Sequence, residues 1–94
     1  MANKVKASKM PNAEFISNAQ ILGKLIKAKR TELQLKLADC ADLCGIGINT
    51  LSRIENGNEN CRLSAVFAVL HGLGIKLSAP ELNQTNITPD DTWV

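Results

Sequence analysis

A short polar segment in the middle of the chain has side chains that can bind the edges of nucleic-acid bases. Asn49, Ser52 and Arg53 lie close together in the sequence, directly after Ile48. An Asn side chain suits adenine, and an Arg side chain suits guanine or a phosphate. Ile48 can contact a thymine methyl but cannot form a bidentate hydrogen bond. If this segment is a helix, its candidate base-reading residues are Ile48, Asn49, Ser52 and Arg53.

The cysteines are the other candidates for chemistry. Cys40 and Cys44 are four residues apart and would share a helix face, but only Cys61 and His71 remain to complete a metal site. This spacing is not that of a zinc site, so burial in a core explains Cys40 and Cys44 better. The sequence has no carboxylate pair, Ser–His–Asp set or phosphate-binding glycine loop. We therefore expect no enzyme, no metal and no cofactor.

Charge is distributed unevenly along the 94 residues. Residues 1–36 hold eight of the 11 Lys and Arg residues and two acidic residues, a net charge of +6. Residues 77–94 hold three acidic residues and no cation. The basic first part indicates a polyanionic partner. The acidic end indicates a second partner or only greater solubility.

Length and composition restrict the class of protein. A chain of 94 residues is expected to form one domain. No apolar run approaches the roughly 18 residues of a membrane-spanning helix, and the first 20 residues contain no apolar stretch of a secretory signal. Three cysteines are too few for a disulfide framework. These features predict a cytoplasmic protein with no membrane partner.

Four helices are expected to position the polar segment. Apolar residues of helical period predict helices from Ser17, with Gln20 at capping-box spacing, to near Thr31, over 36–44, from after Gly47 to about Asn56, and over 62–73. Gly45, Gly57 and Gly74 are expected to end the last three. The compact part is 17–79, between a flexible basic arm (1–16) and a disordered tail (80–94). The predicted inner faces contain Leu37, Ala38, Cys40, Ala41 and Cys44, then Leu51 and Ile54, then Leu63, Val66, Phe67, Leu70 and Leu73.

The two middle helices are short and are joined by Gly45-Ile46-Gly47, a connection typical of a helix-turn-helix motif. The second helix of such a pair lies in the major groove of DNA. After the last helix, apolar and polar residues alternate and predict a strand. A lone strand leaves its backbone groups unpaired, and the same strand of a second copy would pair with it across a two-fold axis. We expect a homodimer with a ribbon formed by Ile75, Lys76, Leu77, Ser78 and Ala79; the alternative is a frayed extension of the last helix.

The stretch from Thr50 to Gly57, Thr-Leu-Ser-Arg-Ile-Glu-Asn-Gly, resembles the lambda-repressor/Cro-like (XRE) helix-turn-helix family. The resemblance covers about residues 18–79. It implies an all-α fold, a four-helix domain followed by the short strand, and a dimer that binds double-stranded DNA at a palindromic operator. It also implies a structural salt bridge between Arg30 and Glu55. The candidate phosphate-binding residues are Lys24, Lys36, Thr50 and Asn56.

The chain departs from the family pattern at the start of both middle helices. Lys36 and Leu37 stand where the family usually has Thr-Gln. Lys36 can replace the phosphate contact as a point charge, but Leu37 cannot replace the Gln. Gly47 replaces a capping Ser or Thr, and Ile48 replaces a long polar side chain. Limited base readout predicts a larger contribution from DNA shape.

Within the family, three features are similar to HipB-like antitoxins: the pattern of the last helix, the strand directly after it, and a polar tail ending in Trp93-Val94. This likeness implies a bacterial, nucleoid-associated autorepressor that is also the antitoxin of a HipA-like kinase. Trp93 is then the candidate for docking on the toxin, since Trp is enriched in binding hot spots. In related three-part systems a separate small protein shares the neutralisation of the toxin.

Three alternatives remain open from the sequence. A stand-alone phage-type or metabolic repressor would have no toxin. A protein-interaction adaptor with weak DNA binding is favoured by Leu37 and Ile48. A metal-sensing regulator would use the three cysteines. The role of the arm, with Lys4, Lys6 and Lys9, is also open, because it can follow a phosphate backbone or only solubilise the chain.

Overall fold

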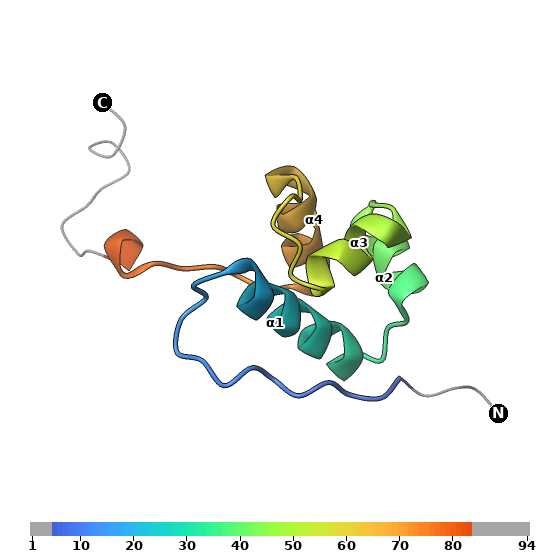
Figure 1. Cartoon of the computed structure of the whole chain (residues 1–94), viewed down its shortest axis with the longest axis horizontal. Helices are drawn as coiled ribbons and strands as arrows, with labels where there is room; N and C mark the ends of the chain where they lie inside the picture. Colours follow the sequence, from blue (N-terminus) through green and yellow to red (C-terminus); the bar gives the residue numbers. More distant parts are fainter. Residues whose placement is uncertain (1–4, 84–94) are drawn as a thin grey trace.

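The computed structural model describes residues 5–83, which form four α-helices and a short 3-10 turn (Figure 1). The predicted number and order of helices are confirmed, and their bounds differ from the predicted ones by at most two residues. Within 5–83 no helix is long and apolar enough to cross a bilayer. The elements are α1 (Ala19–Glu32), α2 (Leu37–Cys44), α3 (Ile48–Glu55), α4 (Leu63–Leu73) and the 3-10 turn η1 (Pro80–Asn83).

The cap of α1 differs from the prediction. Asn18, not Ser17, is the N-cap, and its side-chain oxygen accepts a hydrogen bond of 2.8 Å from the backbone N–H of Ile21. Asn and Ser are about equally good caps, so composition alone does not choose between neighbours. The other end of α1 is followed by Gln34, whose φ of 61° is left-handed although it is not a glycine.

The core is formed by one face of each helix. Ile26 of α1 packs with Leu51 and Ile54 of α3 and with Val69 and Leu70 of α4. Burying side chains of this size stabilises the fold by about 1.5–3 kcal/mol each. The eight buried members of the core are Ile26, Cys40, Ala41, Leu51, Ile54, Val69, Leu70 and Leu73.

The predicted inner face of α4 is partly wrong. Leu63 is 69% exposed and Phe67 is 40% exposed, whereas Val69, which was not expected inside, is fully buried. On α2, Ala38 is also exposed. The α4 sequence is apolar almost all round, so its periodicity does not define which side faces the bundle. Packing against α1, α2 and α3 makes that choice.

A glycine allows α1 and α3 to cross closely. A Cβ atom placed on Gly23 would lie 2.5 Å from the backbone oxygen of Ile54 and 2.7 Å from that of Glu55. Backbone atoms cannot move aside as a flexible side chain can. Gly23 therefore sets the distance between α1 and the C-terminal end of α3.

Two segments outside the helices complete the described chain. Residues 5–16 run back along α1 before the chain turns into it (Figure 1). Residues 75–79 leave α4 without regular secondary structure and lead to η1. Within 5–83 there is no β-strand, and a single chain offers no second copy of 75–79 to pair with. Residues 84–94, and with them Trp93, lie outside the described residues, as does Lys4.

Candidate nucleic-acid interface

The turn between α2 and α3 is built on a left-handed glycine. Gly45 has φ 73° and ends α2, and its N–H donates to the carbonyl of Asp42. The N–H of Ile46 donates to the carbonyl of Ala41 at 3.0 Å, and the half-buried Ile46 side chain packs on the core. This pair of bonds closes the end of α2 in the way that a left-handed cap requires. It directs the chain into α3 within three residues.

One face of α3 is free of the core. Ile48, Asn49 and Arg53 are exposed, and Ser52 is half-buried on the same side. Leu51 and Ile54 point into the core from the opposite side. The four candidate base-reading residues are thus at helix positions i, i+1, i+4 and i+5 on one accessible surface.

Arg30 and Glu55 form a buried ion pair between α1 and the end of α3. The guanidinium Nε donates to Oε2 of Glu55 at 2.6 Å, and Nη2 donates to Oε1 at 3.0 Å. The third nitrogen, Nη1, donates to the carbonyl of Leu35 at 2.7 Å, in the connection between α1 and α2. One side chain therefore holds α1, α3 and the start of the helix-turn-helix together.

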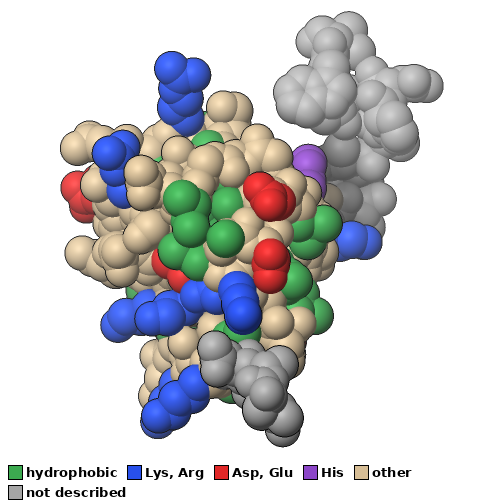
Figure 2. Space-filling view, turned by 90° about the vertical axis from the view of Figure 1, so that its right-hand side faces the viewer, with side chains coloured by type: hydrophobic (Ala, Val, Ile, Leu, Met, Phe, Trp, Pro, Cys, Tyr) green, Lys and Arg blue, Asp and Glu red, His purple; other side chains and the backbone are tan. Residues whose placement is uncertain are grey.

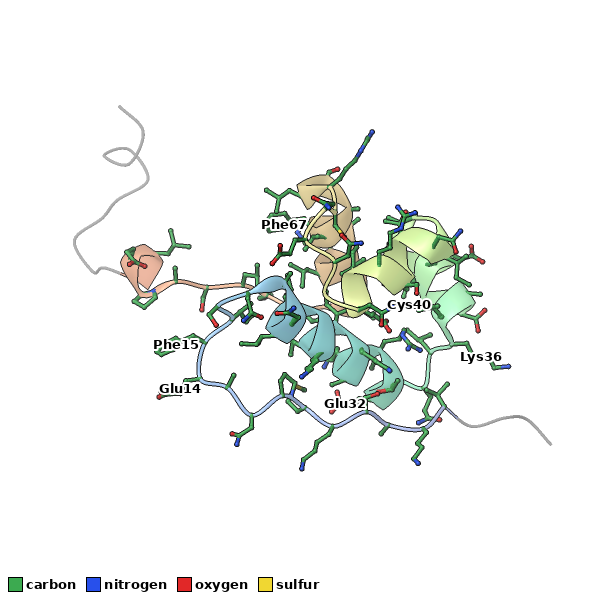
Figure 3. The ribbon with its side chains drawn as sticks, viewed as in Figure 1. Glu14, Phe15, Glu32, Lys36, Cys40 and Phe67 are labelled. Atoms are coloured by element: carbon green, nitrogen blue, oxygen red, sulfur yellow. The ribbon has the colours of Figure 1, made fainter. Side chains whose placement is uncertain are left out.

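The four candidate phosphate-binding residues fall into two groups. Lys36 is the N-cap of α2, and its exposed side chain points away from the helices (Figure 3). Thr50 is half-buried beside the turn between α2 and α3. Asn56 caps the opposite end of α3, where its Nδ2 donates to Oγ of Ser52 at 3.5 Å. Lys24 is exposed on α1, next to the crossing with that same end of α3.

A hollow of about 580 Å³ adds a residue that sequence reasoning missed. It lies between the turn, the outer side of α3 and the start of α4. Arg53 and Arg62 both line it, together with Gly47 and Thr50. Arg62 is the exposed N-cap residue of α4. Its only signal in the sequence is its place just before the apolar run of α4.

Positive charge follows this side of the molecule. Figure 2 shows Lys and Arg side chains spaced from top to bottom along one margin of the side that carries α2 and α3, with acidic side chains nearer the middle. The only ion pairs among residues 5–83 are Lys29 with Glu32 and Arg30 with Glu55. The remaining described cations on this side are available to an anionic partner.

The cysteines belong to the packing of α2. Cys40 is buried, and its Sγ lies 4.0 Å from that of Cys44, which in turn points to the carbonyl of Val69. Burial, with the neighbouring Cys44 thiol, raises the pKa of Cys40 to about 12. Cys61 is half-buried in the loop before α4 and donates to the carbonyl of Asn58. In the described part of the chain no three His, Cys, Asp or Glu side chains gather as metal ligands would.

Comparisons with known proteins agree with this architecture. A family model described as "Helix-turn-helix" matches residues 26–79, more than half of the chain. No curated protein matches. A chain in a solved structure described as "Structure of HipA-HipB-O2-O3 complex" has a TM-score of 0.66 and 24% identity, over 71% of this chain and 94% of that one. A chain described as "MDT Protein" gives the same values.

The structural likeness, at this identity, concerns the fold. The family match covers α2, the turn, α3 and α4, which are the elements that carry the exposed helix face. It agrees with the resemblance of the stretch from Thr50 to Gly57. The chain belongs to the XRE-type helix-turn-helix family of DNA-binding domains.

Proposed function

We propose that this protein is a dimeric repressor that binds a palindromic operator upstream of its own gene. The observation that carries the proposal is the exposed face of α3, with Asn49 and Arg53, held on a rigid frame by the buried pair of Arg30 and Glu55. A helix presented in this way fits the major groove. In this proposal the protein works at the nucleoid in the bacterial cytoplasm.

Base readout rests on few side chains. Asn49 would pair with adenine and Arg53 with guanine or a phosphate, while Ser52 would add a single hydrogen bond. The exposed Ile48 side chain would contact a thymine methyl. Lys36, Thr50, Asn56 and Lys24 would contact the phosphate backbone and fix the register of the helix.

Dimerisation is proposed through residues 75–79. Lys76, Leu77 and Ser78 make no backbone hydrogen bond to another residue within 5–83. Leu77 is 43% exposed, and the nearby arm contributes Phe15, which is 71% exposed. Unpaired backbone beside exposed apolar side chains favours pairing with the same segment of a second copy. Two α3 helices would then enter successive major grooves about 34 Å apart.

A titration tests the DNA-binding proposal. The purified protein is titrated by fluorescence anisotropy against DNA from upstream of its own gene and against a scrambled duplex at the same salt concentration. We expect a preference of about a thousandfold or more for the upstream DNA. Equal, weak and salt-sensitive binding to both would contradict the repressor and favour the protein-interaction adaptor, for which the exposed Ile48 is the supporting observation.

We further propose that the protein is the antitoxin of a HipA-like kinase. The support is the fold likeness to a chain in a HipA-HipB structure, together with the tail that ends in Trp93. A third small protein is included among the proposed partners. A stand-alone repressor would have no such partner.

Co-expression with a neighbouring kinase gene tests the antitoxin proposal. We expect a complex that survives size-exclusion chromatography and protects the host from the kinase. The Trp93→Ala variant should lose partner affinity while keeping its affinity for upstream DNA. Unchanged partner affinity in that variant would remove Trp93 from the interface, and the lack of any complex would favour the stand-alone repressor.

A further inference from the structure

We propose that the N-terminal arm is a docked part of the DNA-binding surface, in which Lys6 contacts the phosphate backbone beside Lys36. The proposal rests on the DNA-binding function proposed above. It concerns the described part of the arm, residues 5–16, which lies outside the matched family region.

The first anchor of the arm is Thr31, near the end of α1. The backbone N–H of Ser8 donates to Oγ1 of Thr31 at 2.8 Å. The same hydroxyl shares its proton between the carbonyls of Lys27 and Ala28, at 2.9 and 3.1 Å. Thr31 is only 2% exposed, so this hydrogen bond is shielded from water. The arm is therefore joined to α1 at a buried and fully bonded side chain.

The second anchor is Gln34, in the connection between α1 and α2. Its Nε2 donates to the carbonyl of Val5 at 3.0 Å and to the carbonyl of Thr31 at 3.3 Å. Its φ of 61° is a conformation that residues other than glycine rarely adopt. The left-handed backbone turns this side chain back toward the arm, and the bonds to Val5 and Thr31 help to offset the strain.

The two anchors place one lysine beside the helix-turn-helix. Lys6 lies between the anchored residues Val5 and Ser8, and its side chain is exposed. Gln34, which holds Val5, is two residues before Lys36, the N-cap of α2. In Figure 3 the arm passes below α1 toward the side on which Lys36 projects, and away from the side of Phe15.

Lys6 is also free to bind an anion. Neither Lys6 nor Lys36 forms an ion pair with another described residue, whereas Lys29 on α1 is paired with Glu32 at 3.3 Å. A free solubilising arm would not need two specific anchors on a buried Thr and a left-handed Gln. Docked lysines of one sign next to a groove-binding helix neutralise phosphates, and each such contact adds about −0.9 to the slope of log K against log salt concentration.

The test measures DNA affinity over a series of salt concentrations for the full chain and its variants. Lys6→Gln should lower the magnitude of the salt slope by about one. It should weaken binding to upstream and scrambled DNA by a similar factor, because a phosphate contact does not read sequence. Lys9→Gln is the matched control: the same charge change on the same arm, beyond the Ser8 anchor and farther from Lys36. Its salt slope should equal that of the wild type.

A second variant separates the docked position from the charge. Gln34→Gly keeps the left-handed backbone without strain and removes only the side-chain bond to Val5. It should lower the salt slope as Lys6→Gln does, and the double variant should show little further loss. In the free protein, Gln34→Gly should also speed hydrogen exchange of the Ser8 amide.

Three outcomes would overturn the inference. The first is a wild-type salt slope for Lys6→Gln. The second is an equal loss for Lys9→Gln, which would indicate a diffuse charged tail. The third is full additivity of Lys6→Gln and Gln34→Gly. The proposed function is judged separately by the wild type, since a wild-type protein that binds upstream DNA leaves it intact in all three cases.

Discussion

The two sides of this small domain differ in what they leave unsatisfied. The side formed by α2 and α3 presents polar and cationic side chains whose backbone is fully helical. The opposite side presents Phe15 and Phe67, with the irregular segment 75–79 running from the end of α4 (Figure 3). The first side lacks counter-ions, and the second lacks apolar cover and backbone partners. A polyanion satisfies the first, and a second protein chain satisfies the second.

The two sides also differ in how firmly they are held. Arg30 joins α1, the end of α3 and the connection before α2 through three hydrogen bonds. Segment 75–79 has one backbone bond from Ile75 to Leu70 at its start and one from Leu82 to Ala79 at its end. The DNA-facing helix is therefore preorganised by the fold, whereas the proposed dimer segment gains its main partners only in the dimer.

Glu55→Ala should have the largest effect, because it removes the frame of the first side. It leaves the Arg30 charge buried without a partner, which costs about 3–5 kcal/mol of unfolding free energy. Chemical denaturation monitored by circular dichroism measures this loss. Glu32→Ala, which breaks the exposed pair with Lys29, is the control and should cost less than about 1 kcal/mol. Similar losses in the two variants would contradict the structural role of the buried pair.

Leu77→Asp should act on the second side alone. It places a charge where an apolar side chain is expected to be buried between subunits, so we expect a loss of about 2 kcal/mol or more in dimerisation. Sedimentation equilibrium should show a monomer that keeps its helical content. Leu33→Ser changes an equally exposed leucine at the end of α1 and should remain dimeric. A wild-type monomer at micromolar concentration would remove the dimer proposal altogether.

Arg53→Ala should act on the first side alone. Loss of a bidentate base contact costs about 1–3 kcal/mol of specific binding and relaxes specificity at one base pair. Lys36→Ala, in contrast, should weaken binding to all sequences and reduce the salt slope by about one. Anisotropy titrations on upstream and scrambled DNA separate these two patterns. An Arg53→Ala variant that weakens both duplexes equally would reassign Arg53 to a phosphate.

The smallest expected effect is a pH dependence that belongs to the core and to neither side. The pKa of Cys40 is raised from about 9.0 to about 12 by burial, so the folded state holds the proton that the unfolded state releases. Stability is therefore unaffected below pH 9 and falls as pH rises toward 12, by about 1 kcal/mol near pH 10. Thermal unfolding of the wild type and of Cys40→Ala at pH 8 and 10 measures it. Identical pH dependence in both proteins would contradict this role of Cys40.

The features predicted from the sequence are those encoded by neighbouring residues. Apolar period placed the four helices, and Gly45 and Gly74 marked two helix ends. The features that were missed depend on residues far apart in the chain. Gly23 is needed only because α3 crosses there, and Gln34 is left-handed beside an arm residue that lies 29 positions earlier. The exposed Leu63 and buried Val69 show that a helix apolar all round takes its orientation from its neighbours.

The central claim is that one side of each subunit reads DNA while the other side joins two subunits. Hydroxyl-radical footprinting on DNA from upstream of the gene tests both parts at once. The account predicts two protected regions related by a two-fold axis, with their centres one helical turn, about 34 Å, apart. Lys6→Gln should weaken protection of the backbone at the outer edges of both regions. A single protected region, or no protection at concentrations that saturate binding, would contradict the account.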